Sequence, residues 1–225
     1  ALILTALSFN AAIAAELPKT DLALNWKPEP EFGGFYEAAL EKLYDKSGIE
    51  VTVLPGGAGQ PVAQMVAGKK VKYGIVAADE LILARAQGAK LVALFAVYQD
   101  DPQGFMVHPD RKVKNLKDLF QSEGTIALQK GLPYTLWLEK QYAPIKAQIV
   151  PYTGGITQFL ASAKGDKSFA QQCFIFSEPI AARREKVNPK TFMISESGFN
   201  PYLSVLVTHE DVIAQERSQV EAVIK

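Results

Sequence analysis

The sequence predicts an α/β protein with two lobes, and three observations lead to this fold class. After residue 20, short apolar segments alternate with amphipathic ones, which is the pattern of strands connected by helices. The same alternation restarts near residue 105, so a second α/β unit is expected. The chain has 225 residues, of which 48% are apolar, so it can bury a core in one or two domains.

The first unit is expected to form right-handed βαβ crossovers and a parallel sheet. Strands are predicted at residues 21–26, 49–54, 72–76 and 91–97, with helices at residues 34–46, 60–67 and 79–87. In the last of these helices, Asp79 is a good N-cap, Leu81 belongs to the buried face, and Gly88 ends the helix.

The second unit repeats this pattern and then leads back to the first. Strands are predicted at residues 105–108, 125–129, 147–152, 173–176 and 191–197, with helices at residues 115–120, 133–142, 155–163 and 178–186. A last strand within residues 202–212 runs into a C-terminal helix.

Proline and glycine punctuate the chain at two places where it is expected to cross between the lobes, near residues 99–105 and 197–203. Lobe 1 is therefore expected to comprise residues 20–100 and 201–225, and lobe 2 residues 101–200.

The N-terminal segment "ALILTALSFNAAIAAELPKTD" resembles the remnant of a secretory signal peptide over residues 1–15, with small residues before the charged sequence. A buried N-terminal helix is the alternative, and the apolar run is too short for a membrane span. Cys173 is the only cysteine, so internal disulfides and Cys-based zinc patterns are excluded. Because no cysteine follows the signal, we expect a periplasmic protein without a lipoprotein anchor and without direct membrane insertion.

The charge balance disfavours nucleic-acid and membrane-surface partners. Lys plus Arg and Asp plus Glu both number 24, and the chain has no basic stripe or tail. We expect a monomer whose partner is a small-molecule ligand.

Ligands of open parallel sheets bind beyond the carboxyl ends of the strands, and this rule selects candidate site segments. In lobe 1 they are Asn25 with Trp26, the "PGGAGQ" loop, residues 77–79, and Gln99 with its neighbour Tyr98. In lobe 2 they are residues 129–134, 152–155 and 177–178.

The segment "NWKPEPEFGGFYEAAL" can be either a strand-to-helix turn or part of a ligand site. Trp26 follows an apolar strand and precedes prolines that stiffen the exit, so its indole can stack on a planar ligand or fill the core. Gly33 permits close backbone approach or simply starts a helix, whose first turn carries Tyr36. The loop "LPGGAGQP" lacks the Walker and dinucleotide spacings, and a tight strand-to-helix loop is the favoured interpretation.

Two acids are candidates for binding N–H donors of a ligand, although each can also cap a helix. Asp79 follows the third strand, and Glu178 begins the helix after "FS" in lobe 2. Catalytic residues are not predicted, because His108 and His209 both lie at element ends and Ser177 has no GxSxG context. A metal site and a cofactor are likewise not expected.

Three segments together resemble a known family. They are "LNWKPEPEFGGFYEA", "KYGIVAADELILARAQGAKLVALFAVYQDDPQGFMVH" and "FSEP". In an exported two-lobe α/β chain, they resemble the NMT1/THI5-like (SsuA/THI5-like) family of ABC transporter substrate-binding proteins, whose relatives include sulfonate, pyrimidine and flavin-type binders. The resemblance covers about residues 20–225.

The resemblance implies a type II periplasmic-binding-protein fold in which each lobe is a mixed, mostly parallel sheet flanked by helices. It also implies a cleft between the lobes and delivery of the ligand to a membrane ABC permease. By position, Trp26 matches the aromatic residue of the family's N-W-x-P motif, and Glu178 matches the acid of its second-lobe motif. The predicted ligand-binding residues are Asn25, Trp26, Gly33, Tyr36, Asp79, Gln99, Tyr134 and Glu178.

One branch of the family is an enzyme, a thiamine-pyrimidine synthase that consumes pyridoxal phosphate and one of its own histidines. Its chemistry needs a Schiff-base lysine and a histidine after the third strand. Here Val76 and Glu80 occupy these positions, and the late cysteine-rich motif is replaced by "GFNPYLSV". These departures favour a binding protein for a small heteroaromatic nutrient, first a thiamine-precursor pyrimidine, with riboflavin or a sulfonate as alternatives.

Overall fold

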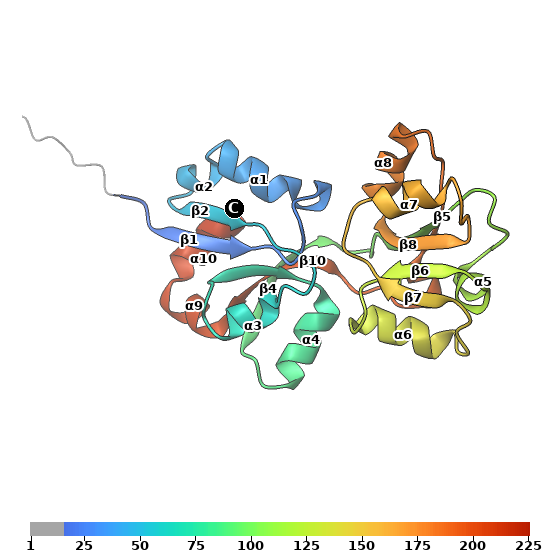
Figure 1. Cartoon of the computed structure of the whole chain (residues 1–225). Coiled ribbons are helices and arrows are strands. Elements are labelled where there is room, and N and C mark those ends of the chain that lie inside the picture. Colours follow the sequence, from blue (N-terminus) through green and yellow to red (C-terminus); the bar gives the residue numbers. More distant parts are fainter. Residues whose placement is uncertain (1–15) are drawn as a thin grey trace, which may run out of the picture.

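The protein folds into two lobes, each built on a five-stranded mixed sheet flanked by helices (Figure 1). The structure is a computed structural model, and it describes residues 16–225. The two-lobed α/β architecture predicted from the sequence is confirmed. The predicted signal-peptide remnant, residues 1–15, lies outside the described residues.

The sheet of lobe 1 has the strand order β2-β1-β3-β10-β4. β1 pairs in parallel with β2 and β3, whereas β10 runs antiparallel to β3 and β4. All strands except β10 therefore run in one direction, as expected for a mixed, mostly parallel sheet. The strands are β1 (Lys19–Ala23), β2 (Glu50–Leu54), β3 (Tyr73–Val76), β4 (Leu91–Tyr98) and β10 (Leu203–His209).

Helices cover both faces of the lobe 1 sheet, with α1 and α2 on one side and α3 and α4 on the other (Figure 1). Apolar residues of α1, α2 and α10 share one buried cluster, and those of α3 and α4 share another. The helices are α1 (Gly33–Leu40), α2 (Leu43–Lys46), α3 (Val62–Ala67), α4 (Ala78–Ala86), α9 (Glu210–Gln215) and α10 (Arg217–Ile224).

Two helix predictions for lobe 1 were wrong in detail. The single helix expected over residues 34–46 is split, because Lys42 has a left-handed backbone with a φ of 54°, which cannot continue a right-handed helix. Asp79 is not the N-cap of α4, because the helix begins one residue earlier and Ala77 occupies the cap position. Asp79 thus lies in the first turn, and the Glu80 carboxylate accepts a hydrogen bond from the Ala77 N–H at 3.1 Å.

The sheet of lobe 2 has the order β7-β6-β8-β5-β9, in which β5 alone runs against the other strands. Its strands are β5 (Gln103–Val107), β6 (Thr125–Leu128), β7 (Gln148–Pro151), β8 (Phe169–Phe174) and β9 (Lys190–Met193). Its helices are α5 (Leu116–Gln121), α6 (Pro133–Gln141), α7 (Thr157–Ser162) and α8 (Glu178–Arg184).

Two strand predictions for lobe 2 need correction. β8 starts at Phe169 and ends at Phe174, so it lies mostly before the expected residues 173–176. Only the first part of the expected strand 191–197 is extended, since Ile194–Ser197 forms the 3-10 helix η2. A second 3-10 helix, η1 (Pro30–Phe32), lies in lobe 1 between β1 and α1.

The two sheets have the same strand order, and in each the antiparallel strand is the one that follows a crossing between the lobes. β5 follows the crossing after β4, and β10 follows the crossing after β9. The Asn200 side chain joins these two crossings: its Oδ1 accepts from the Asp101 N–H at 2.8 Å, and its Nδ2 donates to Asp100 Oδ1 at 3.0 Å. The crossings therefore lie side by side at the junction of the lobes.

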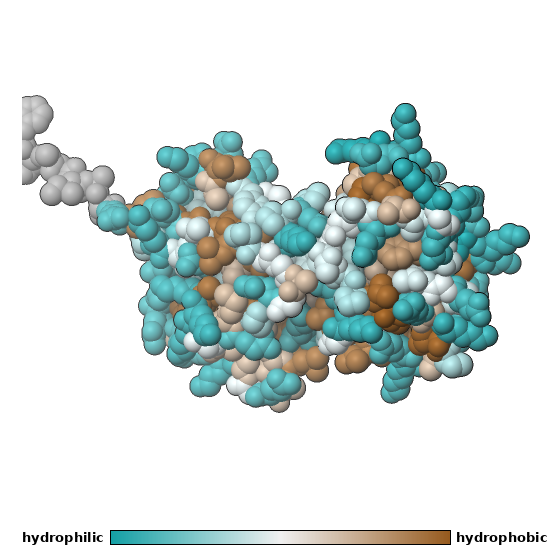
Figure 2. All heavy atoms as spheres, in the orientation of Figure 1, coloured by the Kyte–Doolittle hydropathy of each residue, from teal (hydrophilic) through white to brown (hydrophobic). Residues whose placement is uncertain are grey.

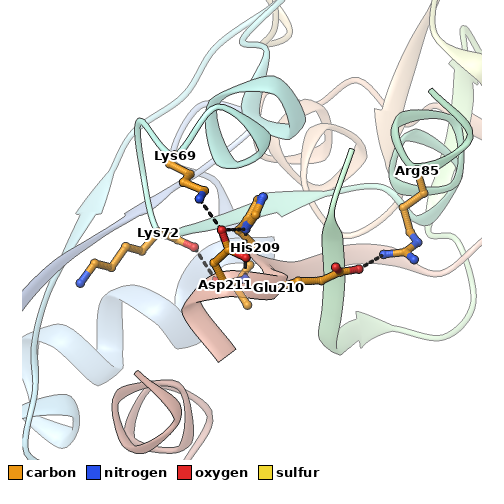
Figure 3. Close-up of polar contacts among 7 residues, drawn as sticks. Lys69, Lys72, Arg85, His209, Glu210 and Asp211 are labelled. Atoms are coloured by element: carbon orange, nitrogen blue, oxygen red, sulfur yellow. Dashed lines mark hydrogen bonds and ion pairs between the residues drawn. The ribbon is translucent and has the colours of Figure 1, made fainter. Parts of the chain in front are cut away.

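Polar contacts hold the turn from β10 into α9 (Figure 3). His209 Nδ1 accepts a hydrogen bond from the Asp211 N–H at 3.1 Å, so the imidazole caps the helix. The Asp211 carboxylate pairs with Lys69, and Glu210 pairs with Arg85 at 3.4 Å. The interpretation of His209 as a structural element end is thus supported.

The other histidine, His108, is also structural. Its ring is buried and stacks on Phe159 with the ring centroids 4.1 Å apart. Its Nε2 lies 2.7 Å from the Ser162 hydroxyl. Neither histidine is among the residues that line the cavity between the lobes.

The surface of the described residues carries mixed hydrophilic and apolar patches, with a hollow where the two lobes meet along the upper edge of the view (Figure 2). None of the helices within residues 16–225 is both long enough and apolar enough to cross a membrane.

Candidate ligand-binding cleft

A cavity of about 100 Å³ lies between the lobes, and both sheets contribute to its walls. From lobe 1 come the loops after β1, β2 and β3, and from lobe 2 the loops after β6, β7 and β8. Both crossings add residues as well. The cavity therefore lies where the rule for parallel sheets predicts a ligand, beyond the carboxyl ends of the strands.

Trp26 forms part of the lobe 1 wall and also touches lobe 2. Its side chain is only 8% exposed, and its indole stacks on Tyr152, with centroids 6.1 Å apart and planes inclined by 18°. The indole N–H donates to Glu29 Oε1 at 3.3 Å. The indole thus stacks on an aromatic residue of the opposite lobe, while Trp26 still lines the cavity.

The glycine loop after β2 packs against the backbone of Trp26. The Gly56 N–H donates to the Trp26 carbonyl at 3.0 Å, and a Cβ at Gly56 would lie 2.0 Å from the Leu24 carbonyl oxygen. A side chain cannot be accommodated there without moving the backbone. This agrees with the interpretation of "PGGAGQ" as a tight strand-to-helix loop.

Three acids at the lobe 1 side and the first crossing each carry a buried carboxylate oxygen without a hydrogen-bond partner. These atoms are Glu31 Oε2, Asp79 Oδ1 and Asp101 Oδ2, and all three residues line the cavity. Glu31 is 3% exposed and Asp101 is 2% exposed. Leaving such atoms unpaired costs about 1–3 kcal/mol each, which a ligand with hydrogen-bond donors would recover.

Burial sets the protonation of these acids. Desolvation, followed by the nearby charge of Glu29, raises the pKa of Glu31 to about 8. Desolvation likewise raises the pKa of Asp101 to about 6 and raises the pKa of Asp79. The cavity therefore disfavours several negative charges at once unless positive charge or N–H donors are supplied.

The lobe 2 wall, in contrast, is hydrogen-bonded internally. Gln172 Oε1 accepts from the Tyr134 hydroxyl and from the Gln129 N–H, and Gln172 Nε2 donates to Gln129 Oε1 at 3.1 Å. The Glu178 carboxylate accepts from the Tyr152 hydroxyl and, at 2.8 Å, from the Phe174 N–H. Desolvation nevertheless raises the pKa of Glu178, since its side chain is buried at the start of α8.

Direct contacts join the lobes beside the cavity. Lys27 Nζ donates to the Thr153 carbonyl at 2.6 Å, and the Ser177 hydroxyl donates to Glu29 Oε2 at 3.2 Å. Together with the stack of Trp26 on Tyr152, these contacts hold the lobes against each other.

Five of the eight predicted site residues line this one cavity, namely Asn25, Trp26, Asp79, Tyr134 and Glu178. The other three do not line it. Gly33 and the half-buried Tyr36 lie on α1, and Gln99 is exposed after β4.

Sequence reasoning missed several lining residues, among them Glu31, Asp101 and Gln172. Glu31 lies within the segment already singled out after Trp26, but its position on the short helix η1 could not be foreseen. Asp101 precedes a proline at the predicted crossing, and its charge at this position was the one feature of the sequence that could have indicated a site residue.

The residues present equip the cavity for binding. Within residues 16–225, no group of three or more His, Cys, Asp or Glu side chains is arranged to hold a metal ion. The lining combines aromatic rings with amide, hydroxyl and carboxylate groups. Such a mixture can hold a planar molecule by stacking and orient it by hydrogen bonds.

Two lobes of identical strand order with a cavity between them define a type II periplasmic-binding-protein fold. The alkanesulfonate-binding protein SsuA from Xanthomonas axonopodis pv. citri, bound to MOPS, matches with a TM-score of 0.63 at 15% identity, over 94% of this chain and 72% of that chain. An ancestral arginine-binding protein bound to arginine matches with a TM-score of 0.62 at 11% identity, over 92% of this chain and 91% of that chain. These likenesses confirm the predicted fold class.

The chain also resembles known proteins in sequence. The model of the NMT1/THI5-like family matches residues 29–225, and the chain belongs to this family. The riboflavin-binding protein RibY of Chloroflexus aurantiacus is 24% identical over 219 residues, which are 93% of this chain and 60% of RibY. The chain therefore spans less than two thirds of the length of this curated relative.

Proposed function

We propose that this protein is the substrate-binding component of an ABC importer and holds a small heteroaromatic nutrient between its two lobes. The observation that carries this proposal is the cavity at the strand ends of both sheets, with Trp26 and Tyr152 in its lining. Closure of two lobes over a ligand excludes water and strengthens its polar contacts. Membership of the NMT1/THI5-like family supports the same class of function.

A thiamine-precursor pyrimidine is the first candidate ligand, and the size of the cavity favours it. The cavity of about 100 Å³ is small beside the roughly 300–1,000 Å³ of ordinary ligand pockets. A single ring fits such a space more readily than a tricyclic flavin. An adjoining cavity of about 260 Å³ shares lining residues with it and is the space that a larger ligand would also have to use, namely the one beside Asn25, Gln60, Glu80, Leu132 and Pro133. Riboflavin is the second candidate, because the relative RibY is a riboflavin-binding protein.

A sulfonate is less well supported as the ligand. Anion sites in proteins are made from Arg, Lys and free backbone N–H groups. Among the described residues that line the cavity, none is Lys, Arg or His, and five are Asp or Glu. The structural likeness to an alkanesulfonate-binding protein therefore concerns the fold, and the side chains here favour a different ligand.

The remaining expectations complete the proposed function. The protein would act as a monomer in the periplasm after removal of a signal peptide, and it would deliver its ligand to a membrane permease. Nucleic acid is not an expected partner, given the equal numbers of basic and acidic residues. No cofactor is expected.

The synthase alternative makes a separate prediction. A pyridoxal phosphate aldimine requires a lysine in the site, whereas the aligned position, Val76, is a buried residue of β3. Adding pyridoxal phosphate should therefore produce no aldimine absorbance band. A band that disappears on substitution of a lysine would overturn the proposal that the protein is not an enzyme.

Thermal denaturation with a panel of ligands tests the proposed function. The panel contains 4-amino-5-hydroxymethyl-2-methylpyrimidine, riboflavin, an alkanesulfonate and arginine. A ligand bound only by the native state raises its stability in proportion to the logarithm of its concentration. We expect the pyrimidine to raise the melting temperature, and no rise with any heterocycle would refute the heteroaromatic assignment.

A further inference from the structure

We infer that the cleft selects a positively charged ligand, a planar organic cation whose N–H groups reach the carboxylates of lobe 1 and of the first crossing. This inference deepens the proposed function and rests on it, because it concerns the same cavity. It goes further in assigning the charge of the ligand, which neither the fold nor the family determines. Proteins of this fold include one bound to the sulfonate MOPS and one bound to arginine.

Three carboxylate oxygens in the cavity have no hydrogen-bond partner. Glu31 and Asp101 are both more than nine-tenths buried, line the cavity, and have a carboxylate oxygen without a hydrogen-bond partner. Asp79 contributes a third such oxygen. Buried polar groups in native proteins are nearly always paired, so three orphaned acceptors in one cavity indicate that donors come from a bound molecule.

The charged side chains around the cavity are all acidic. Five acids line it, and among the described lining residues there is no Lys, Arg or His to balance them. The remaining polar lining groups, such as the amides of Asn25 and Gln103, are neutral. A neutral ligand could pair some oxygens but would leave the repulsion between the acids, whereas a cation removes both penalties.

Aromatic side chains line the cavity beside the acids. Trp26, Phe32, Tyr152 and Phe174 line the same cavity as the acids. The faces of aromatic rings attract cations, and this attraction grows when both partners are shielded from water. A flat cation would therefore use the aromatic and the acidic parts of the lining together.

Protonation supports the same conclusion. The pKa of Glu31 is raised to about 8, with desolvation as the largest cause, and that of Asp101 to about 6. Both acids thus hold their charge poorly without a ligand, and a bound cation would restore it.

A matched pair of probes tests the inference. Benzamidine is a planar cation with N–H donors, and benzamide has nearly the same shape without the charge. Isothermal titration of the full chain at pH 7.5 should show benzamidine binding at least about tenfold more tightly than benzamide, because hydrogen bonds between charged groups are stronger than neutral ones. Equal binding, or no binding of benzamidine, overturns the inference.

Variants locate the effect in the cavity. Asp101→Asn and Glu31→Gln each remove one lining carboxylate and keep its shape, whereas Glu37→Gln removes one exposed charge from α1 as the matched control. Both lining variants should weaken benzamidine binding about tenfold and change benzamide binding less than threefold. Weakening by Glu37→Gln to the same extent would mean that net charge, and not the cavity, attracts the cation, and this would overturn the inference.

The outcomes separate this inference from the proposed function. If neutral pyrimidines or riboflavin stabilise the protein and benzamidine does not bind, the proposed function stands and the cation inference fails. If arginine and benzamidine bind but no heterocycle does, the cation inference stands and the heteroaromatic assignment fails.

Discussion

Lobe 1 and lobe 2 have the same strand order, yet they present different walls to the cavity. In lobe 2, Tyr134, Gln172, Tyr152 and Glu178 satisfy one another by hydrogen bonds. On the side of lobe 1, Asp79 and Glu31 leave carboxylate oxygens unpaired. The polar groups of the lobe 2 wall are thus hydrogen-bonded without a ligand, while carboxylate oxygens of the lobe 1 wall lack hydrogen-bond donors.

This difference suggests that two lobes of the same topology have different roles, one in keeping the geometry of the site and one in selecting the ligand. A wall whose polar groups are already paired keeps its geometry and gives the ligand a fixed surface. Unpaired acceptors destabilise the protein without a ligand, and a ligand that donates hydrogen bonds to them removes this cost. Affinity and selection by charge should therefore come mainly from the lobe 1 wall. The predictions below test this division, beginning with the largest expected effect.

The largest effect is expected from Gly56→Ala, because Gly56 packs closely against the backbone of Leu24 and Trp26. The new Cβ would lie 2.0 Å from the Leu24 carbonyl oxygen and 2.8 Å from the Trp26 nitrogen, so the chain must shift. We expect a loss of about 3 kcal/mol in the free energy of unfolding, measured by urea denaturation, together with weaker ligand binding.

Gly57→Ala is the control for this prediction, because a Cβ at Gly57 meets no atom within 4 Å. Its effect on stability should stay within about 0.5 kcal/mol. Similar losses in the two variants would show that close packing beneath Trp26 does not organise the lobe 1 wall.

Glu178→Ala should be the next most destabilising change, because it removes the carboxylate that accepts two hydrogen bonds in the lobe 2 wall. The Phe174 N–H would lose its acceptor in a buried place, and the Tyr152 hydroxyl would keep only the Gly155 carbonyl at 3.3 Å. We expect the free energy of unfolding to fall by about 2–3 kcal/mol in urea denaturation. Glu185→Ala, at an exposed position at the end of the same helix, should change it little, and an equal loss there would contradict the role of pairing.

Glu31→Gln should act in the opposite direction and depend on pH. Burial raises the pKa of Glu31 from its ordinary 4.5 to about 8, and the charges of Glu29 and Glu178 add to the rise. Between these values the unfolded chain releases the proton first, so this group makes stability fall as pH rises from about 4.5 to 8.

Removing this carboxyl should therefore stabilise the empty protein by about 1–2 kcal/mol at pH 8 and by much less at pH 5. Urea denaturation at the two pH values measures the difference. Glu37→Gln is the control, since this exposed acid lies outside the cavity lining. A stabilisation by Glu31→Gln that does not vary with pH would count against the buried, protonated carboxyl.

The smallest effect is expected from Tyr134→Phe, which removes one donor from the lobe 2 network. Gln172 Oε1 would keep the hydrogen bond from the Gln129 N–H, so no acceptor is left unpaired. The free energy of unfolding should fall by about 1 kcal/mol or less, and the exposed Tyr202→Phe should leave it unchanged. A large loss would mean that this wall is less redundant than its hydrogen bonds suggest.

Local patterns in the sequence predicted most strands and helices and part of the site. Asn25, Asp79 and Glu178 were predicted because each lies within a few residues of the carboxyl end of a strand, and the ends of parallel strands converge in any fold of this class. The break at Lys42 was missed, since a single left-handed residue leaves no periodic signal.

The acids that dominate the cavity could not be brought together from the sequence. Glu31 lies on a short 3-10 helix and Asp101 on a crossing, and their shared position depends on how the two lobes close. The stacking of Trp26 on Tyr152 has the same origin, because it joins residues of different lobes. Whether a strand-end residue faces ligand or the opposite lobe is a property of the assembled fold.

The link made by Asn200 bears on how long a ligand would stay bound. Because this side chain ties both crossings together, the lobes should open by one concerted rotation about the paired crossings. The other contacts between the lobes, from Lys27 to Thr153 and from Ser177 to Glu29, would then have to break when the lobes open. We therefore expect the residence time of the ligand, more than its rate of entry, to be set by residues that do not touch it.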